Sequence, residues 1–241
     1  GVKGVILAGG SGTRLRPLTR LINKHLLPVG NYPMIHYGVQ KMSKAGIKEI
    51  MLIISKQSAG MYMDYFGTGS EFGVSITYKV QEEAGGIAQA LSLAEGFIQP
   101  QDKFAVLLGD NLFTADLGNY VQAFAQTQDQ ALVLLKEVDD PRRYGVPALD
   151  GERIRYIEEK PQQPKSNYCV TGIYMYDGRV FDYIRQIKPS DRGELEITDV
   201  NNEYAKRGTL VYRLLDGWWT DAGTFASLLE ANQKLTREDA N

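Results

Sequence analysis

The sequence predicts an α/β fold, built on a Rossmann-like, doubly wound sheet that is mixed but mainly parallel. Three observations support this prediction. Short apolar runs alternate with helical segments through the first half of the chain, which is the order typical of a parallel sheet. The 241 residues are 43% apolar, which is enough to bury one sizeable core. No internal repeat, low-complexity tract or linker divides the chain, so we expect a single domain over residues 1–241.

Strands and helices are expected to alternate as far as residue 136. The expected strands are 5–7, 49–54, 74–80, 104–108 and 131–136. The expected helices are 33–45, 61–66, 87–98 and 117–126. Pro33 is expected at the first helical position, where its missing N–H costs nothing, and Gly46 is placed to end that helix.

In the second half of the chain, strands and helices no longer alternate regularly. Asp150 and Gly151 form a strong hairpin signal between two alternating runs, 144–149 and 153–158. The other expected elements are strands 168–176 and 210–214 and helices 180–186, 199–207 and 224–235. We expect this half to form a subdomain laid on the same sheet.

Composition argues against several classes of partner. The formal net charge is −2, so the basic excess expected of a nucleic-acid or anionic-membrane surface is missing. No apolar run approaches 18 residues and no signal-peptide pattern is present, which favours a cytoplasmic protein. Cys169 is the one cysteine, so an intramolecular disulfide is impossible, and its apolar surroundings favour a buried side chain.

A glycine-rich segment follows the first strand directly. It comprises Ala8, Gly9, Gly10, Ser11 and Gly12. Glycine adopts positive φ without strain, so such a turn can bring backbone N–H groups close to a polyphosphate. Thr13 and Arg14 add a hydroxyl and a guanidinium that match phosphate oxygens. The alternative is that this segment is an ordinary loop after a strand. It is not the dinucleotide-binding fingerprint, because that motif needs a third glycine where this chain has Leu15.

Three further polar residues lie at expected strand ends. Asp110 follows the run 104–108, where a carboxylate can hold Mg²⁺ against phosphate oxygens, although a turn or cap residue is also common there. Gln81 carries an amide that can donate to one carbonyl of a pyrimidine and accept from its ring N–H, and Gly86 allows close approach; a surface residue is the alternative. Lys160 can act as a point charge on a monoester phosphate, but it also fits a solvated charged run.

The segment GGSGTRLRPLT, with Lys24 in NKHLLPVG, resembles the opening of the sugar-1-phosphate nucleotidylyltransferases. It is most similar to the glucose-1-phosphate thymidylyltransferase branch. Further motifs of the family follow in its order: VQEEAGGIAQA, LGDN, RYGV, EEKP, VTG, RGELEITDV and GWWTDAGT. The resemblance extends from Gly4 to about Ala231, and it implies a short form of a branch whose members often carry further C-terminal helices.

The resemblance implies a set of site residues. The implied catalytic residues are Arg14, Lys24, Asp110 and Lys160. The implied nucleotide-binding residues are Ala8, Gly9, Gly10, Ser11, Gly12, Thr13, Arg14, Lys24, Gln81, Gly86 and Asp110. The implied sugar-phosphate-binding residues are Asn111, Tyr144, Gly145, Glu159, Lys160, Val170 and Arg192. Asp110 and Asp221 would hold Mg²⁺, whereas Glu194 and Glu196 are expected to be mainly structural.

The implied reaction is in-line attack of glucose 1-phosphate on the α-phosphorus of dTTP, giving dTDP-glucose and pyrophosphate. The nucleotide would bind to residues of about 1–136 and the sugar phosphate to about 137–241. The product would serve rhamnose-type deoxysugars of cell-surface glycans. The resemblance also implies a homo-oligomer, tetramer or dimer, with Tyr37 or Tyr62 as exposed interface aromatics.

Three other functions are left open by the sequence. One is a sister enzyme that uses UTP, CTP or ATP. Another is a nucleotide-sugar-binding regulatory protein, which would be expected to lack one or more of the four implied catalytic residues; all four are present. The third is a glycosyltransferase, but no D-x-D metal motif follows an apolar strand.

Overall fold

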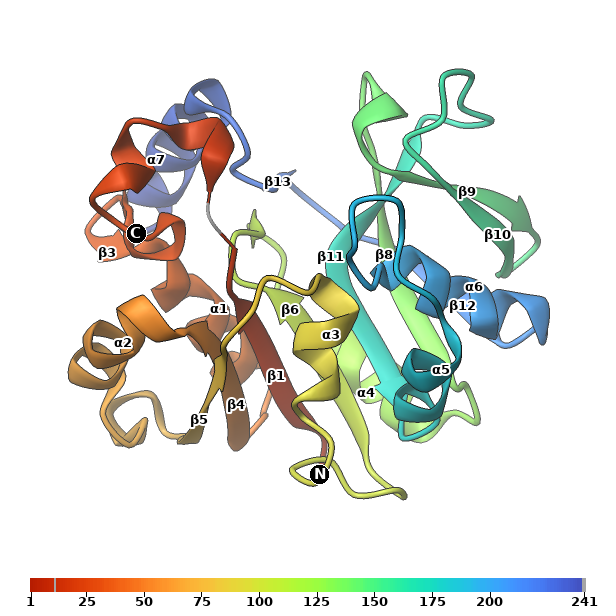
Figure 1. The fold of residues 1–241 in the computed structure, drawn as a ribbon, viewed down its shortest axis with the longest axis horizontal. Helices are drawn as coiled ribbons and strands as arrows, with labels where there is room; N and C mark the ends of the chain where they lie inside the picture. Colours follow the sequence, from red (N-terminus) through yellow and green to blue (C-terminus); the bar gives the residue numbers. More distant parts are fainter. Residues whose placement is uncertain (11, 240–241) are drawn as a thin grey trace.

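The computed structural model describes residues 1–10 and 12–239, with the backbone alone for residues 237–239. A nine-stranded sheet spans the molecule in the order β5-β4-β1-β6-β11-β8-β12-β10-β9 (Figure 1). Its strands are β1 Lys3–Ala8, β4 Glu49–Ser55, β5 Ser75–Gln81, β6 Lys103–Leu108, β8 Ala131–Glu137, β9 Gly145–Asp150, β10 Arg153–Glu159, β11 Tyr168–Asp177 and β12 Leu210–Leu214.

The sheet is mixed, as predicted. Strands β5, β4, β1 and β6 are mutually parallel, and β8 and β12 are parallel to each other. Strand β11 is antiparallel to both of its neighbours, β6 and β8, while β10 is antiparallel to β12 and β9. Only β11 and β10 therefore oppose the common strand direction in this sheet, so the adjacent strands β5, β4, β1 and β6 have their four carboxyl ends at the same edge.

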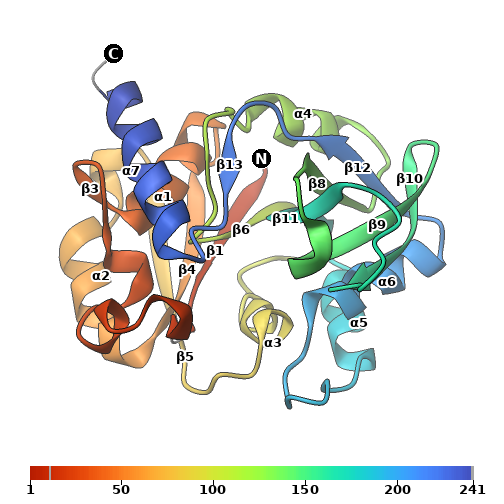
Figure 2. The same ribbon diagram turned by 90° about the horizontal axis from the view of Figure 1, so that it is seen from above.

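Helices cover both faces of the sheet. They are α1 Met34–Lys44, α2 Ala59–Phe66, α3 Ile87–Ser92, α4 Gly118–Gln126, α5 Val180–Gln186, α6 Ile197–Lys206 and α7 Phe225–Asp239. Helices α3, α5 and α6 pack on one face, and α1, α2 and α4 pack on the other (Figure 2). Each strand of the centre is buried on both faces, which explains its continuous apolar run. None of the described helices is long and apolar enough to cross a membrane.

Two pairs of very short strands were not expected from the sequence. Strand β2 (Pro28–Val29) pairs with β3 (Tyr32–Pro33), and β7 (Leu112–Phe113) pairs with β13 (Trp219–Thr220). The second pair carries the segment before α7 back over the sheet, so that α7 packs beside β2 (Figure 1). Two residues show no periodicity, which is why this long-range pairing is not visible in the sequence.

Some predicted features are wrong in detail. The helix expected over 87–98 ends at Ser92, and Gly96 then adopts a φ of 97° that no α-helix contains. Pro33 lies before α1 in extended conformation rather than at its first helical position. Tyr37 and Tyr62 are buried, so neither can mark an exposed interface. Cys169 is buried as predicted, and burial raises the pKa of its thiol to about 12.

Candidate active site

The candidate site lies at the carboxyl ends of β1 and β6. These strands are parallel neighbours, with Leu7 opposite Leu108, so the segments that follow them leave the sheet at the same edge. The amide of Gly109 donates to the carbonyl of Leu7 at 2.8 Å, which ties the two exits together. A Cβ on Gly109 would lie 3.0 Å from the ring of His25, so only glycine allows this approach.

The glycine-rich loop has the positive φ values that its sequence predicted. Gly10 has a φ of 100° and Gly12 a φ of 61°, both in the region that side chains disfavour. The hydroxyl of Thr19 donates to the Gly12 carbonyl at 2.7 Å and holds the loop against the following segment. Ser11, predicted to bind nucleotide, lies outside the described residues.

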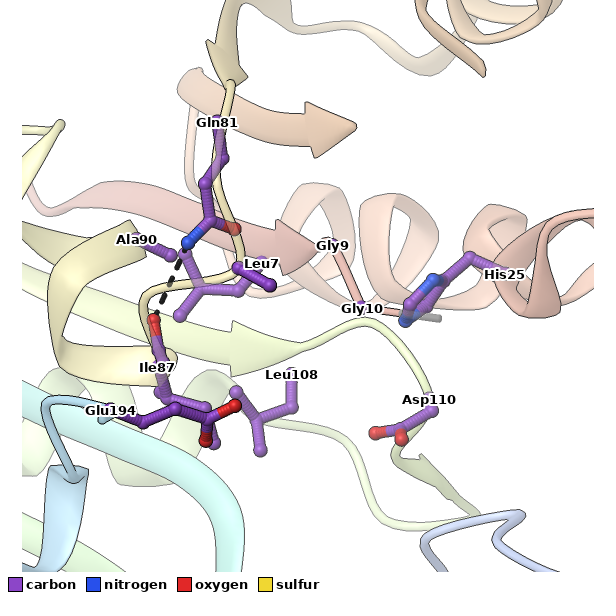
Figure 3. Close-up of a pocket in the computed structure, with 12 residues that line it drawn as sticks. Leu7, Gly9, Gly10, His25, Gln81, Ile87, Ala90, Leu108, Asp110 and Glu194 are labelled. Carbon is purple, nitrogen blue, oxygen red and sulfur yellow. Dashed lines mark hydrogen bonds between the residues drawn. The ribbon is translucent and has the colours of Figure 1, made fainter. Parts of the chain in front are cut away.

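Two cavities meet at Asp110. The first, of about 210 Å³, is lined by Leu7, Gly9, Gly10, His25, Gln81, Ala84, Gly86, Ile87, Ala90, Leu108, Asp110 and Glu194. Figure 3 shows Gln81 and Glu194 entering it from opposite sides, with His25 and Asp110 at one end. The second, of about 250 Å³, shares Ile87, Leu108 and Asp110 with the first. Two ligands that met at Asp110 would therefore fill one continuous site.

The second cavity gathers most of the predicted sugar-phosphate residues. Asn111, Tyr144, Gly145, Glu159, Val170 and Arg192 all line it, as do Arg14 and Asp221. The Thr198 hydroxyl donates to Glu159, which orients that carboxylate. Burial raises the pKa of the Tyr144 phenol to about 12, so this residue stays protonated and able to donate a hydrogen bond.

Lys24 and Asp110 form an ion pair beneath the two cavities. Lys24 Nζ lies 2.7 Å from Asp110 Oδ2, and Lys24 is 8% exposed. Burial alone would raise the pKa of Asp110, but the Lys24 ammonium and its hydrogen bond hold that pKa below its usual value. The carboxylate is therefore ionised at neutral pH. Lys24 lines neither cavity. It can therefore act on a ligand only through the charge of Asp110, or by leaving its ion pair with Asp110 to contact the ligand directly.

His25 is a cavity residue that the sequence prediction missed. It is buried, and burial lowers its pKa to about 4, so the imidazole is neutral. The Asn23 Oδ1 atom accepts from the His25 backbone N–H at 3.0 Å and from the Tyr62 hydroxyl at 3.0 Å. The same oxygen lies 3.2 Å from His25 Nδ1, which fixes the ring. The one feature of the sequence that could have indicated His25 as a site residue is its position next to Lys24.

Asn111 connects three parts of the site. Its Oδ1 atom accepts from the Gly172 amide at 2.8 Å and from Trp219 Nε1 at 2.7 Å, and its Nδ2 atom donates to Asp110 at 3.1 Å. The side chain is 3% exposed. Asn111 thus joins β11 and β13 to the Asp110 carboxylate. Trp219 also lines the second cavity, and it was not predicted from the sequence as a site residue.

Arg192 is at the rim of the second cavity with its charge already paired. Its Nε and Nη2 atoms donate to the two oxygens of Glu196 at 2.7 and 3.0 Å, and Glu194 lies 3.0 Å from Nε. The glutamates predicted to be mainly structural therefore reach the site: Glu196 neutralises Arg192, and Glu194 lines the first cavity. A phosphate would have to compete with Glu196 for the guanidinium.

Several predicted residues do not line either cavity. Ala8 is fully buried, and Gly12, Thr13 and Lys160 also lie outside both linings. Lys160 is exposed and has a φ of 45°, while its amide donates to the Tyr144 carbonyl. Arg14 lines the second cavity, where its guanidinium packs against Gly223, rather than the cavity that contains Gln81.

The carboxylates suit a metal ion that is shared with a substrate. Among residues 1–10 and 12–239 no group of three or more His, Cys, Asp or Glu side chains forms a metal cluster. Asp110 and Asp221 line the same cavity. Asp110 Oδ1 accepts from the neutral Asn111 amide at 3.1 Å, and Asp221 Oδ2 lies 3.9 Å from Arg143. Mg²⁺ commonly takes one or two carboxylates and completes its shell with phosphate and water, which fits this pair.

The loop after Gln81 is attached to the segment that precedes α6. The Leu195 amide donates to the Gly85 carbonyl at 2.9 Å, and the Ala88 amide donates to the Leu195 carbonyl at 3.1 Å. Gly86 has a φ of 97°, and a Cβ there would lie 2.5 Å from the Leu195 carbonyl oxygen. This close contact joins the loop after Gln81 to the segment that carries Glu194 and Glu196.

Comparison with known proteins agrees with this geometry. The nucleotidyl transferase family model matches residues 3–238. A glucose-1-phosphate thymidylyltransferase of Neisseria meningitidis is 45% identical over 240 residues, covering 95% of this chain and 81% of the relative.

Solved structures show the same fold. A Bacillus anthracis protein, described as a candidate glucose-1-phosphate thymidylyltransferase in complex with a sucrose, superimposes with a TM-score of 0.93 and 54% identity. That match covers 98% of this chain and 96% of the other. A UDP-glucose pyrophosphorylase complexed with UDP-glucose gives a TM-score of 0.87 and 25% identity, covering 99% of this chain and 100% of the other.

Proposed function

Because the chain belongs to the nucleotidyl transferase family, we propose that it transfers a thymidylyl group from dTTP to α-D-glucose 1-phosphate, giving dTDP-glucose and pyrophosphate. The observation that carries this proposal is the meeting of two cavities at Asp110. One cavity contains the amide of Gln81, suited to a base, and the other contains the polar groups suited to a sugar phosphate. A site of this shape fits a reaction that joins a nucleotide to a sugar phosphate.

The chemistry requires no covalent intermediate with the protein. A phosphate oxygen of glucose 1-phosphate forms a bond to the α-phosphorus of dTTP. The bond from that phosphorus to the oxygen bridging the β-phosphate breaks, and pyrophosphate leaves with the electron pair. Both reactants are anionic, so the main tasks of the protein are to align them and to offset their charge.

The residues divide these tasks. Gln81 and Gly86 bind the base, and the glycine-rich loop presents backbone N–H groups to the triphosphate. Arg14 lines the second cavity, where it can hold the phosphates that leave. Glu159 accepts hydrogen bonds from sugar hydroxyls, and Lys160 approaches the sugar phosphate from the exposed rim.

Mg²⁺ is proposed to be held by Asp110 and Asp221. When bound there it would supply a Lewis acid for a phosphate oxygen. Lys24 keeps Asp110 ionised, so the carboxylate is ready to accept a cation. We also propose that the chain forms a homo-oligomer; the apolar side chains that α2 exposes, Met61, Met63 and Tyr65, support this.

UTP is the second candidate nucleotide, because the similar UDP-glucose pyrophosphorylase was solved with UDP-glucose. The test is pyrophosphate release with glucose 1-phosphate and Mg²⁺, with dTTP, UTP, CTP, ATP and GTP offered one at a time. We expect the highest kcat/KM with dTTP. A higher value with UTP would change the substrate but retain the reaction, whereas no release with any nucleotide would contradict the proposed function.

A further inference from the structure

Gln89 holds the amide of Gln81 in one orientation. Gln81 Nε2 donates to Gln89 Oε1 at 2.6 Å and lies 3.5 Å from the carbonyl oxygen of Gly86. A backbone carbonyl can only accept, so the atom that faces Gly86 must be the amide nitrogen. Both amide hydrogens of Gln81 thus have acceptors in the protein itself. Figure 3 draws one of these two contacts as the dashed line that leaves the Gln81 nitrogen.

The oxygen of the same amide remains available inside the first cavity. A Cβ on Gly9 would lie 2.6 Å from Gln81 Oε1, so the oxygen stands directly over the glycine-rich loop. Gln81, Gly9 and Gly86 all line the first cavity. The sequence predicted that the Gln81 amide would both donate to and accept from a base. The structure differs, because the donor end is already used.

Gln89 contacts Gln81 from outside the lining of the first cavity. It belongs to α3, is partly buried, and is not among the residues that line either cavity. Helix α3 is held in place by the fully buried Ala88 and Leu91 and by the hydrogen bond from the Ala88 amide to Leu195. The backbone that carries Gln89 is therefore held in place by these buried contacts of α3.

We propose that Gln89 is a positioning residue that makes Gln81 present only an acceptor to the nucleotide base. This inference rests on the proposed function, in which the first cavity holds the base. Thymine and uracil carry a hydrogen on N3 that Gln81 Oε1 can accept. Cytosine has a lone pair on N3, which would face the lone pairs of that oxygen. Gln89 thereby selects an N3–H pyrimidine without touching it.

The test compares two nucleotides that differ only at the edge in question. dTTP and 5-methyl-dCTP share the sugar, the phosphates and the 5-methyl group. Their dissociation constants are measured by titration calorimetry with Mg²⁺ for the wild type and three variants. Gln89→Met removes the acceptor at similar size, and Gln89→Glu keeps an acceptor. Gln122→Met, on the exposed surface of α4, is the matched control.

The wild type is expected to prefer dTTP strongly. In Gln89→Met the Gln81 amide loses the 2.6 Å hydrogen bond and keeps only the 3.5 Å contact with the Gly86 carbonyl, which holds it weakly. The amide can then turn and offer its nitrogen to the base, so the preference should fall by about tenfold, the value of one hydrogen bond. Gln89→Glu and Gln122→Met should keep the wild-type preference. A purely structural role for Gln89 would instead weaken binding of both nucleotides equally in Gln89→Met and leave their ratio unchanged.

An unchanged ratio in Gln89→Met, or a wild type that binds both nucleotides equally, would overturn the inference. Because binding is measured without turnover, the result is separate from the proposed reaction. A protein that shows the expected ratios but releases no pyrophosphate with glucose 1-phosphate would contradict the reaction and support the role of Gln89.

Discussion

Lys24 Nζ and Asp110 Oδ2 lie 2.7 Å apart, although 86 positions separate the two residues in the chain. Lys24 is supplied by a short 3₁₀ turn, Lys24–Leu26, and Asp110 by the segment that follows β6. The pair is almost closed to solvent on the lysine side, at 9% side-chain exposure, and more open on the aspartate side, at 23%. The carboxylate is thus kept ionised while one side of it faces the two cavities.

Replacing Asp110 should separate its two roles. In Asp110→Asn the shape is kept, but Lys24 loses its counter-charge and the cavities lose a carboxylate. We expect kcat/KM to fall about 100-fold or more, in line with the loss of one charge-stabilising group in an active site. The free energy of unfolding should fall by about 1–3 kcal/mol, because the ammonium is left unpaired. Pyrophosphate release and urea denaturation measure the two effects; activity within tenfold of the wild type would contradict the assignment.

His25 should make the protein less stable in mild acid. Its pKa is about 4 in the folded protein, against an ordinary histidine value of 6.5, because burial disfavours the imidazolium. Between these two values the unfolded chain binds a proton that the folded chain does not, so stability falls as pH falls from 6.5 to 4. The full loss is on the order of 3 kcal/mol. Above pH 6.5 His25 contributes no pH dependence.

The variant His25→Gln isolates this effect. Its unfolding free energy should fall less than that of the wild type between pH 7.5 and 4.5 in urea titrations. His36, the other histidine of the sequence, is present in both proteins, so its contribution cancels. Parallel pH profiles for the two proteins would show that His25 titrates normally when the protein is folded.

Asn111 should matter for both stability and turnover. Asn111→Ala leaves the Gly172 amide and Trp219 Nε1 without their acceptor, which should cost about 2–4 kcal/mol. Asn111→Asp keeps that acceptor but places a second carboxylate beside Asp110. We expect thermal denaturation to show most of the stability recovered in Asn111→Asp, with activity still low. Equal activity in the wild type and Asn111→Asp would show that the hydrogen bond to Asp110 is dispensable.

Lys160 and Arg192 should contribute unequally to sugar-phosphate binding. Arg192 is bound by both oxygens of Glu196, whereas none of the described carboxylates forms an ion pair with Lys160. Lys160→Gln should therefore raise the KM for glucose 1-phosphate by about tenfold or more, the value of a charge-assisted hydrogen bond, and Arg192→Gln should raise it less. Glu196→Gln frees Arg192 and should lower that KM. Steady-state kinetics at saturating nucleotide provide the measurement, and a larger effect at Arg192 would reverse the ranking.

The sequence by itself determined the fold class and most of the strands and helices. The apolar runs before Gly9 and Asp110 became parallel neighbours, and the glycines predicted to turn the first loop have positive φ at Gly10 and Gly12. These features follow from local physics, because strand burial and glycine conformation depend on a few adjacent residues. The family motifs also contain residues that line the two cavities, such as Gln81 in the first and Asn111 in the second, but they did not indicate His25 or Trp219.

Tertiary structure decided what each polar group is free to do. The pairing of Arg192 with Glu196, the hold of Gln89 on Gln81, and the neutral state of His25 cannot be read from the residue types. Nor does spacing show that Asn111 meets Gly172 and Trp219, which lie 61 and 108 positions away. The order of the strands brings such groups together. Burial then decides whether each group is charged, and its neighbours decide which of its donor and acceptor atoms remain available to a ligand.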